Sequence, residues 1–319
     1  MTQPVVGLSP ERLLRSGHGL WSAHVLQAAL GLGVFTELGR GPRTRAQLQR
    51  SLRLREPGAA DLLDTLLGLG WLEREGDDDG AVYVNSREAG HYLDARSAAA
   101  VGRWLPAAFA LATPVAESLA AVLRGDAAAP LLPLADDTLQ AWAALVGAAL
   151  AQRLPLAQVH GVLGIGGGAV PTLCALAAVR PHLHALALVA PQDLAAVRDE
   201  IGARVLAARL RAQAQRLPWP RADHVLVHRW WPDQGDDQLA AAREALGEGG
   251  RLLWIDHWLD DARRDSAAAL MVVLRRRLAG HAVHADTVRA ARDRCLAAGF
   301  ARTDVAPLGG GLAVVQAFA

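Results

Sequence analysis

The stretch Val159-His160-Gly161-Val162-Leu163-Gly164-Ile165-Gly166-Gly167-Gly168-Ala169-Val170 decides the fold of this chain. An apolar, partly β-branched run leads into three consecutive glycines, and an alanine- and leucine-rich segment follows. This order predicts a strand, a tight turn and the first helix of a parallel α/β sheet. Glycines at such a turn let the backbone bend sharply and pass close to a ligand. The stretch therefore predicts the place where a nucleotide-like cofactor would normally lie.

The composition indicates a globular protein that is long enough for two cores. The chain has 319 residues, of which 52% are hydrophobic and 20% charged, and its formal net charge is +1. This balance gives no electrostatic reason to expect a nucleic-acid partner. All 33 basic residues are arginine, which excludes chemistry that depends on a lysine amine. Two cysteines, Cys174 and Cys295, are too few for a disulfide framework or a thiolate metal site, and we expect no bound metal.

No segment of the sequence has the pattern of a targeting peptide or a membrane span. Residues Met1 to Pro10 lack the basic and apolar layout of a signal peptide. No apolar run approaches the ~20 residues that a transmembrane helix needs. We therefore expect a cytoplasmic protein that does not bind membranes.

Residues 1–95 have the pattern of a winged helix. Apolar residues recur at helical spacing over Glu11–Leu38, two short helices follow, and residues 71–84 alternate as a β-hairpin with an acidic turn. The predicted second short helix carries Glu56, Asp61 and Asp64, which would repel the phosphates of DNA. We therefore expect no DNA binding here. The apolar surface of the first helix instead predicts contact with a second subunit.

The rest of the chain divides into a helical segment and an α/β domain. Residues 96–150 are alanine- and leucine-rich and predict a linker that walls off a pocket. Residues 151–319 alternate strands and helices, which predicts a Rossmann-like parallel sheet. Residues 197–217 have the composition of a continuous helix, at a place where such folds commonly have another strand.

This order of elements resembles the small-molecule O-methyltransferases that use S-adenosylmethionine, over nearly the whole chain. The resemblance rests on residues 21–35, 61–74, 243–253 and 298–300. It implies a winged-helix dimerisation domain, a Rossmann-like catalytic domain and a homodimer. It also implies that Gly166, Gly167 and Gly168 are the remnant of the glycine motif that holds the methyl donor.

The sequence departs from the family in four features of the donor and base sites: the glycine motif, the acid that takes the ribose, the acid near the adenine, and the base. The acidic residue of the first strand is Gly164, and the Thr-Gly-like pair after the glycines is Ala169-Val170. The acidic residue that takes both ribose hydroxyls is Val189, with Asp193 four residues further on. No carboxylate lies near Leu210-Arg211, where the adenine partner would fall, and the histidine base of the family is missing from Trp231-Pro232-Asp233. We therefore expect a degenerate cofactor site and no bound cofactor.

Titratable residues follow two predicted strands that the resemblance makes neighbours. One strand ends at His228, with Asp233 close behind, and the other ends at Asp256 and His257. A histidine beside a carboxylate suits proton transfer near neutral pH, so these four residues are the candidate catalytic groups. The alternative interpretation is that both histidines are partly exposed residues at helix starts. Four tryptophans are the candidate substrate-pocket residues: Trp104, Trp230, Trp231 and Trp258.

These observations lead to three functional hypotheses. The first is a methyltransferase-like enzyme of secondary metabolism that has lost S-adenosylmethionine binding. It would promote a cyclisation, dehydration, isomerisation or pericyclic step on a hydrophobic small molecule without a cofactor. The second is an S-adenosylmethionine-dependent O-methyltransferase with a divergent donor site. The third is a ligand-binding pseudoenzyme without catalytic activity.

Overall fold

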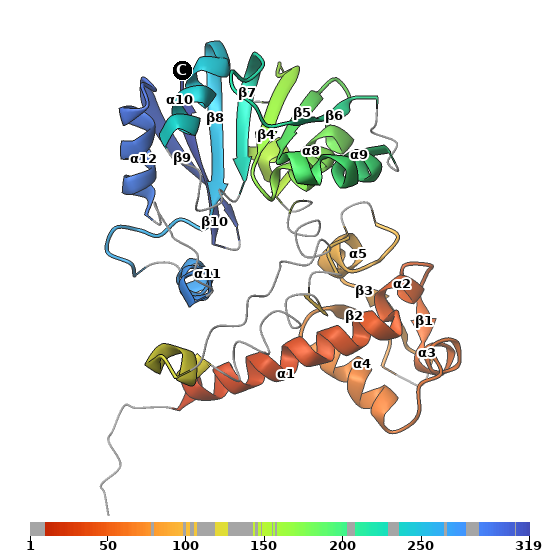
Figure 1. Ribbon diagram of the computed structural model, residues 1–319. Coiled ribbons are helices and arrows are strands. Elements are labelled where there is room, and N and C mark those ends of the chain that lie inside the picture. The colour runs from red at the N-terminus through yellow and green to blue at the C-terminus, as the bar shows by residue number, and fades with distance from the viewer. Residues whose placement is uncertain are drawn as a thin grey trace, which may run out of the picture. The chain divides into compact units, whose positions relative to one another are not determined.

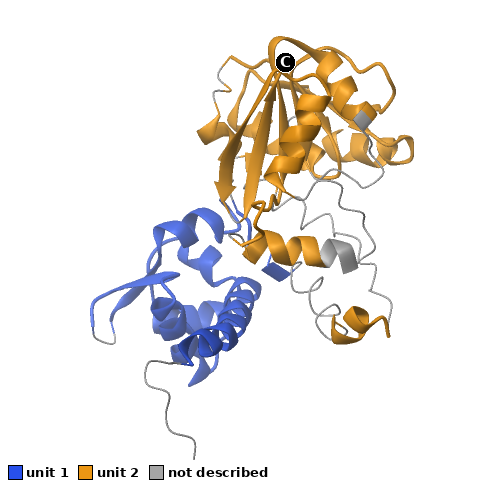
Figure 2. Ribbon diagram, turned by 90° about the vertical axis from the view of Figure 1, so that its left-hand side faces the viewer, with its two compact units in different colours: residues 1–109 blue, residues 110–319 orange. Residues whose placement is uncertain are grey.

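A computed structural model gives the fold of two compact units, residues 1–109 and residues 110–319 (Figure 2). The structure describes residues 10–77, 80–97, 100–102, 105–106, 119–126, 143, 146–147, 149–154, 156, 158–202, 208–228, 236–264, 267–278, 287–309 and 311–319. Most of the predicted linker, residues 96–150, lies outside these ranges, so the three-part division of the chain stays a prediction.

The first unit is a winged helix, as the sequence predicted. A three-stranded antiparallel sheet of order β1-β3-β2 packs beside helices that bury one apolar face each. Thr44 begins α3 with a capping box, in which its hydroxyl accepts from the Gln47 amide and the Gln47 side chain accepts from the Thr44 amide. The elements are α1 (Glu11–Leu32), α2 (Val34–Leu38), β1 (Arg43–Thr44), α3 (Arg45–Leu52), α4 (Gly58–Gly68), β2 (Leu72–Glu75), β3 (Val82–Asn85) and α5 (Arg87–Tyr92).

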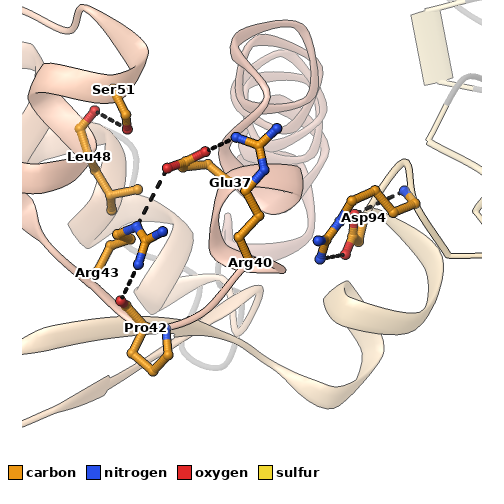
Figure 3. A network of polar contacts seen from close by, with 8 residues as sticks. Glu37, Arg40, Pro42, Arg43, Leu48, Ser51 and Asp94 are labelled. Atoms are coloured by element: carbon orange, nitrogen blue, oxygen red, sulfur yellow. Dashed lines mark hydrogen bonds and ion pairs between the residues drawn. The ribbon is translucent and has the colours of Figure 1, made fainter.

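Ion pairs tie the end of α2 to the segment that follows it (Figure 3). The buried carboxylate of Glu37 accepts from Arg40 at 2.6 Å and from Arg43 at 3.5 Å. Asp94 is paired with Arg96 at 2.9 Å, and that guanidinium holds the pKa of the Asp94 carboxyl below its usual range. Three arginines of the winged helix, Arg40, Arg43 and Arg96, therefore pair with carboxylates of the same unit.

The second unit is a seven-stranded sheet with helices on both faces (Figure 1). The strand order is β6-β5-β4-β7-β8-β10-β9, in which the first five strands are parallel and β10 runs antiparallel to both neighbours. This is the predicted Rossmann-like sheet. Its elements are β4 (Gly161–Ile165), α8 (Ala169–Val179), β5 (His184–Val189), η1 (Pro191–Asp193), α9 (Leu194–Gly202), β6 (Leu210–Ala214), β7 (Ala222–His228), α10 (Asp236–Ala245), β8 (Leu246–Asp256), α11 (Ala267–Leu278), α12 (Val288–Ala297), β9 (Arg302–Gly309) and β10 (Leu312–Phe318).

Alternation along the strands divides the core between the two faces of the sheet. Val162 of β4 packs with α8 residues such as Leu173, whereas Leu163 packs with α10 residues such as Leu239. Because successive side chains point to opposite faces, a strand buried on both sides is apolar throughout. This explains why Val162, Leu163 and Ile165 are all buried in one short strand.

The prediction of a continuous helix over residues 197–217 was wrong, because Leu210–Ala214 forms the edge strand β6. Buried Leu210 and Ala212 alternate with exposed Arg211 and Gln213, which is the period of a half-buried strand. Arginine, glutamine and alanine favour helices on their own. Pairing with β5 overrides that local preference.

The helices of the described residues are short or carry charges. None of them combines the length and the apolar character that crossing a bilayer requires.

A carboxylate fixes the start of the central strand β4. Asp223 accepts hydrogen bonds from the backbone amides of His160 at 2.9 Å and Gly161 at 2.8 Å. Partial burial by itself raises the pKa of Asp223. The two amides and the nearby imidazoles of His224 and His160 together lower the pKa by more than burial raises it, so the net shift is downward. The charged carboxylate thus stabilises the folded chain.

We expect Asp223→Asn to lower the free energy of unfolding by about 1 kcal/mol at pH 7, because a charge-assisted acceptor is lost. The folded pKa lies below the unfolded value of about 3.9, so the contribution is complete above that value and is lost as the pH falls through the folded pKa. Urea unfolding at pH 7 and pH 3 checks this. Asp199→Asn, at an exposed position of α9, is the control. An equal difference at both pH values would contradict the prediction.

Candidate functional site

The chain reverses its direction of winding between β4 and β7. From β4 it proceeds outward through α8 to β5 and then to β6, and it returns to the other side of β4 as β7. The carboxyl ends of β4 and β7 therefore flank a topological switch point, the place where open α/β sheets bind ligands. Gly166–Gly168 follow one of these strands and His228 ends the other.

The glycine loop is tied directly to the end of β7. Gly166 has a φ of +95°, which favours glycine, and its carbonyl accepts from the Ala169 amide. The Gly168 amide donates to the carbonyl of His228 at 3.1 Å. A Cβ on Gly168 would lie 2.5 Å from His228 Nδ1. Glycine is therefore required at 166 for the turn and at 168 because the imidazole lies against it.

His228 is buried and contacts a residue that the sequence analysis did not single out. Its Nδ1 lies 2.7 Å from Thr172 Oγ1 and 3.2 Å from the Gly168 carbonyl oxygen. Thr172, in the first turns of α8, also donates from Oγ1 to the Gly168 carbonyl at 2.7 Å. Only 2% of His228 and none of Thr172 is exposed to solvent. A threonine inside an alanine- and leucine-rich helix was the available signal, because a buried hydroxyl needs a partner.

Asp256 and His257 lie at the end of the neighbouring strand. β7 and β8 are parallel, and His228 pairs with Ile255, so Asp256 is one residue beyond that register position. The Asp256 carboxylate accepts from the His257 amide at 2.7 Å and lies 3.9 Å from His257 Nδ1. Both residues are buried, at 7% and 3% exposure. The strand ends are adjacent as expected, and the alternative interpretation of partly exposed histidines at helix starts was wrong.

Of the four candidate pocket tryptophans, the structure describes Trp258. Trp258 is buried and packs edge-on against Trp254, with ring centroids 5.0 Å apart. Both tryptophans belong to the apolar core on the α10 and α12 face of the sheet. Trp104, Trp230, Trp231 and Asp233 lie outside the described residues. Their roles stay predictions.

The glycine loop lies where the resemblance places the methyl donor, but the side chains around it differ from those that the family uses. A Cβ on Gly164 would lie 2.5 Å from Leu173 Cδ1 and 3.3 Å from Ala169 Cβ, so the place of the family's acidic residue is filled by apolar atoms. β5 ends at half-buried Val189, and the first carboxylate beyond it, Asp193, is exposed. A donor bound here would therefore depend mainly on backbone groups of residues 166–168.

Comparison with known proteins matches both units. Residues 14–95 match the model of the O-methyltransferase dimerisation domain. The chain is 28% identical over 283 residues to the tetracenomycin polyketide synthesis 8-O-methyl transferase TcmO of Streptomyces glaucescens, covering 82% of this chain and 83% of that protein. It is also 28% identical over 291 residues to the 3-hydroxy-5-methyl-1-naphthoate 3-O-methyltransferase of Streptomyces sahachiroi, covering 84% and 83%.

Solved structures show the same fold over the full length. Human N-acetylserotonin methyltransferase in complex with SAM aligns with a TM-score of 0.74, at 20% identity over 99% of both chains. The pyocyanin biosynthetic protein PhzM also aligns with a TM-score of 0.74, at 16% identity. The chain thus has a region that matches the O-methyltransferase dimerisation domain, followed by a Rossmann-like domain with the fold of these methyltransferases. The matched proteins carry the names of methylating enzymes, which lends no support to the expected loss of S-adenosylmethionine binding.

We expect Gly168→Ala to lower the free energy of unfolding by about 1–3 kcal/mol, the usual cost of forcing extra atoms into a packed core. Truncation in the double variant Gly168→Ala/His228→Ala should recover much of this loss, because the colliding ring is gone. Denaturant unfolding of both single variants and the double variant measures the coupling. Gly166→Ala is the control, since its cost comes from the positive φ and His228→Ala should not relieve it. If the destabilisations caused by Gly168→Ala and His228→Ala simply added in the double variant, the imidazole would not be the reason for a glycine at position 168.

Proposed function

We propose that this chain is an enzyme of natural-product biosynthesis that methylates a hydroxyl group of a hydrophobic aromatic molecule, with S-adenosylmethionine as donor. The observation that carries the proposal is the glycine loop at the switch point of a methyltransferase-type sheet, within a chain similar to curated O-methyltransferases over both units. The names of those relatives, for a polyketide and a naphthoate, support an aromatic substrate. The donor, when bound, would supply an electrophilic methyl group.

The residues of the site divide the remaining tasks. The backbone of Gly166–Gly168, at the start of α8, would hold the donor, because the loop keeps its turn without any side chain. His228, Asp256 and His257 gather at two adjacent strand ends, where a base could accept the hydroxyl proton of the substrate. Asp233 remains a further candidate for that base. We propose Trp258, together with Trp104, Trp230 and Trp231, as apolar walls around an aromatic ring.

A cofactor-independent reaction is the second candidate. Leu173 fills the space beside Gly164, and Val189 offers no acceptor for ribose hydroxyls at the end of β5. A buried hydroxyl left without a partner costs about 1–3 kcal/mol. These two positions would therefore lower the affinity for the methyl donor, which favours a reaction without a cofactor. Shape and the same acid/base residues would then promote a rearrangement of a hydrophobic substrate.

Calorimetric titration with S-adenosylhomocysteine separates the two candidates. We expect the native chain to bind with a Kd below about 1 mM, and Val189→Asp to tighten binding at least about tenfold, because a carboxylate gains two charge-assisted contacts. Val189→Asn is the matched control, because asparagine has the size of aspartate but carries no charge. Failure of both the native chain and Val189→Asp to bind at millimolar ligand would exclude methyl transfer and leave the cofactor-independent reaction.

We propose that the chain forms a homodimer through its N-terminal unit. The match to a dimerisation domain supports this, and α1 exposes large apolar side chains that a partner would cover. Trp21 is 70% exposed and Leu20 is 57% exposed. The same helix also exposes Leu13, Leu14 and Leu32.

We expect Trp21→Glu to shift the protein from dimer to monomer at micromolar concentration, because the charge would be buried against an apolar partner surface. Light scattering coupled to size-exclusion chromatography measures the mass. Leu217→Glu, at a 63% exposed leucine of the second unit, should leave the dimer intact. A monomeric native protein, or a dimeric Trp21→Glu variant with unchanged affinity, would refute this interface.

A further inference from the structure

The contacts among Gly168, Thr172 and His228 can be assigned by counting protons. The Thr172 hydroxyl has one proton and lies 2.7 Å from both the Gly168 carbonyl oxygen and His228 Nδ1. The carbonyl can only accept. If the hydroxyl proton pointed at Nδ1, the Gly168 oxygen would face two lone pairs, one from Thr172 at 2.7 Å and one from Nδ1 at 3.2 Å. That arrangement sets one lone pair against another at 2.7 Å, although the same oxygen also accepts from the Thr172 backbone amide at 3.3 Å.

The opposite assignment gives each of these three contacts a proton. The Thr172 hydroxyl donates to the Gly168 carbonyl four residues earlier, and His228 Nδ1–H donates to Thr172 Oγ1, with the Gly168 oxygen as a second, longer acceptor. A neutral imidazole bonded in this way carries its lone pair on Nε2. Because all three residues are buried, the arrangement without repulsion between lone pairs is the more favourable one.

We infer that Thr172 is a positioning residue that holds His228 in the Nδ1–H tautomer, so that Nε2 is the atom through which His228 exchanges protons. The arrangement follows the logic of a base that a third group orients. Thr172 also fixes the Gly168 carbonyl, so one hydroxyl sets the glycine loop and the ring together. The use of Nε2 as the base that accepts the substrate proton rests on the proposed function. The assignment of the tautomer does not depend on the proposed function.

The same geometry explains two residue choices at once. Gly168 has an ordinary φ of −95°, so backbone conformation does not demand a glycine there. It is a glycine because the ring that Thr172 holds lies over its Cα, where a Cβ would come within 2.5–3.0 Å of three ring atoms. Thr172 is buried in an otherwise apolar helix because its hydroxyl has two partners.

Nitrogen NMR of histidine-labelled protein tests the assignment without substrate or donor. The chain has 11 histidines, and the signal that disappears in His228→Gln identifies the ring. At pH 8 we expect a protonated-type shift at Nδ1 and an unprotonated-type shift at Nε2. Thr172→Val, which removes only the hydroxyl, should give a mixture of tautomers, and Thr172→Ser should keep the native pattern.

Each result decides the inference. Protonation at Nε2 in the native protein would overturn the tautomer, and an unchanged pattern in Thr172→Val would overturn the role of Thr172. Retention of the native fold in Thr172→Val, checked by its amide spectrum, excludes simple unfolding as the cause of a change. Since no step of this test needs methyl transfer, loss of the proposed function would leave a positive tautomer result intact, and the reverse also holds.

Discussion

The structure of the second unit depends on the pairing of β4 with two parallel neighbours. β4 is five residues long, yet hydrogen bonds hold it to β5 on one side and β7 on the other. Two apolar cores cover its opposite faces, and Asp223 fixes its first amides. Because all three strands run the same way, their carboxyl ends meet at one edge. This constraint brings the glycine loop and His228 to the same edge, where the Gly168 amide and Thr172 contact His228.

Much of this arrangement could be predicted from the sequence, because it follows from local patterns. The run from Val159 to Val170 specifies a strand, a turn and a helix by itself, and the winged helix follows from helical spacing and a hairpin with an acidic turn. The position of His228 and Asp256 at strand ends is also a local property. Their adjacency needed the strand order, which the family resemblance supplied and the register of β7 and β8 confirms.

The remaining features are properties of packing that no local pattern carries. The edge strand β6 forms from residues with helical preference because β5 offers it backbone partners. Thr172 gives no signal as a partner of His228, since 56 residues separate them and the contact exists only after α8 and β7 pack together. The requirement for Gly168 has the same origin. Sequence reasoning found the glycine but attributed it to a ligand, whereas the structure places an imidazole against it.

The departures from the family motif and the similarity to methylating enzymes are compatible in physical terms. The family resemblance places charged contacts to a donor at Gly164 and Val189, and such contacts are each worth about 1.5–3 kcal/mol. The turn of residues 166–168 is made by backbone and by the contact with His228, so it survives without those side chains. Losing two such contacts weakens binding by about 3–6 kcal/mol, or a factor of roughly 10² to 10⁴ in Kd. The proposed donor site therefore depends on whether the backbone of residues 166–168 can hold a donor without carboxylates beside it, and the measured affinity for S-adenosylhomocysteine decides this.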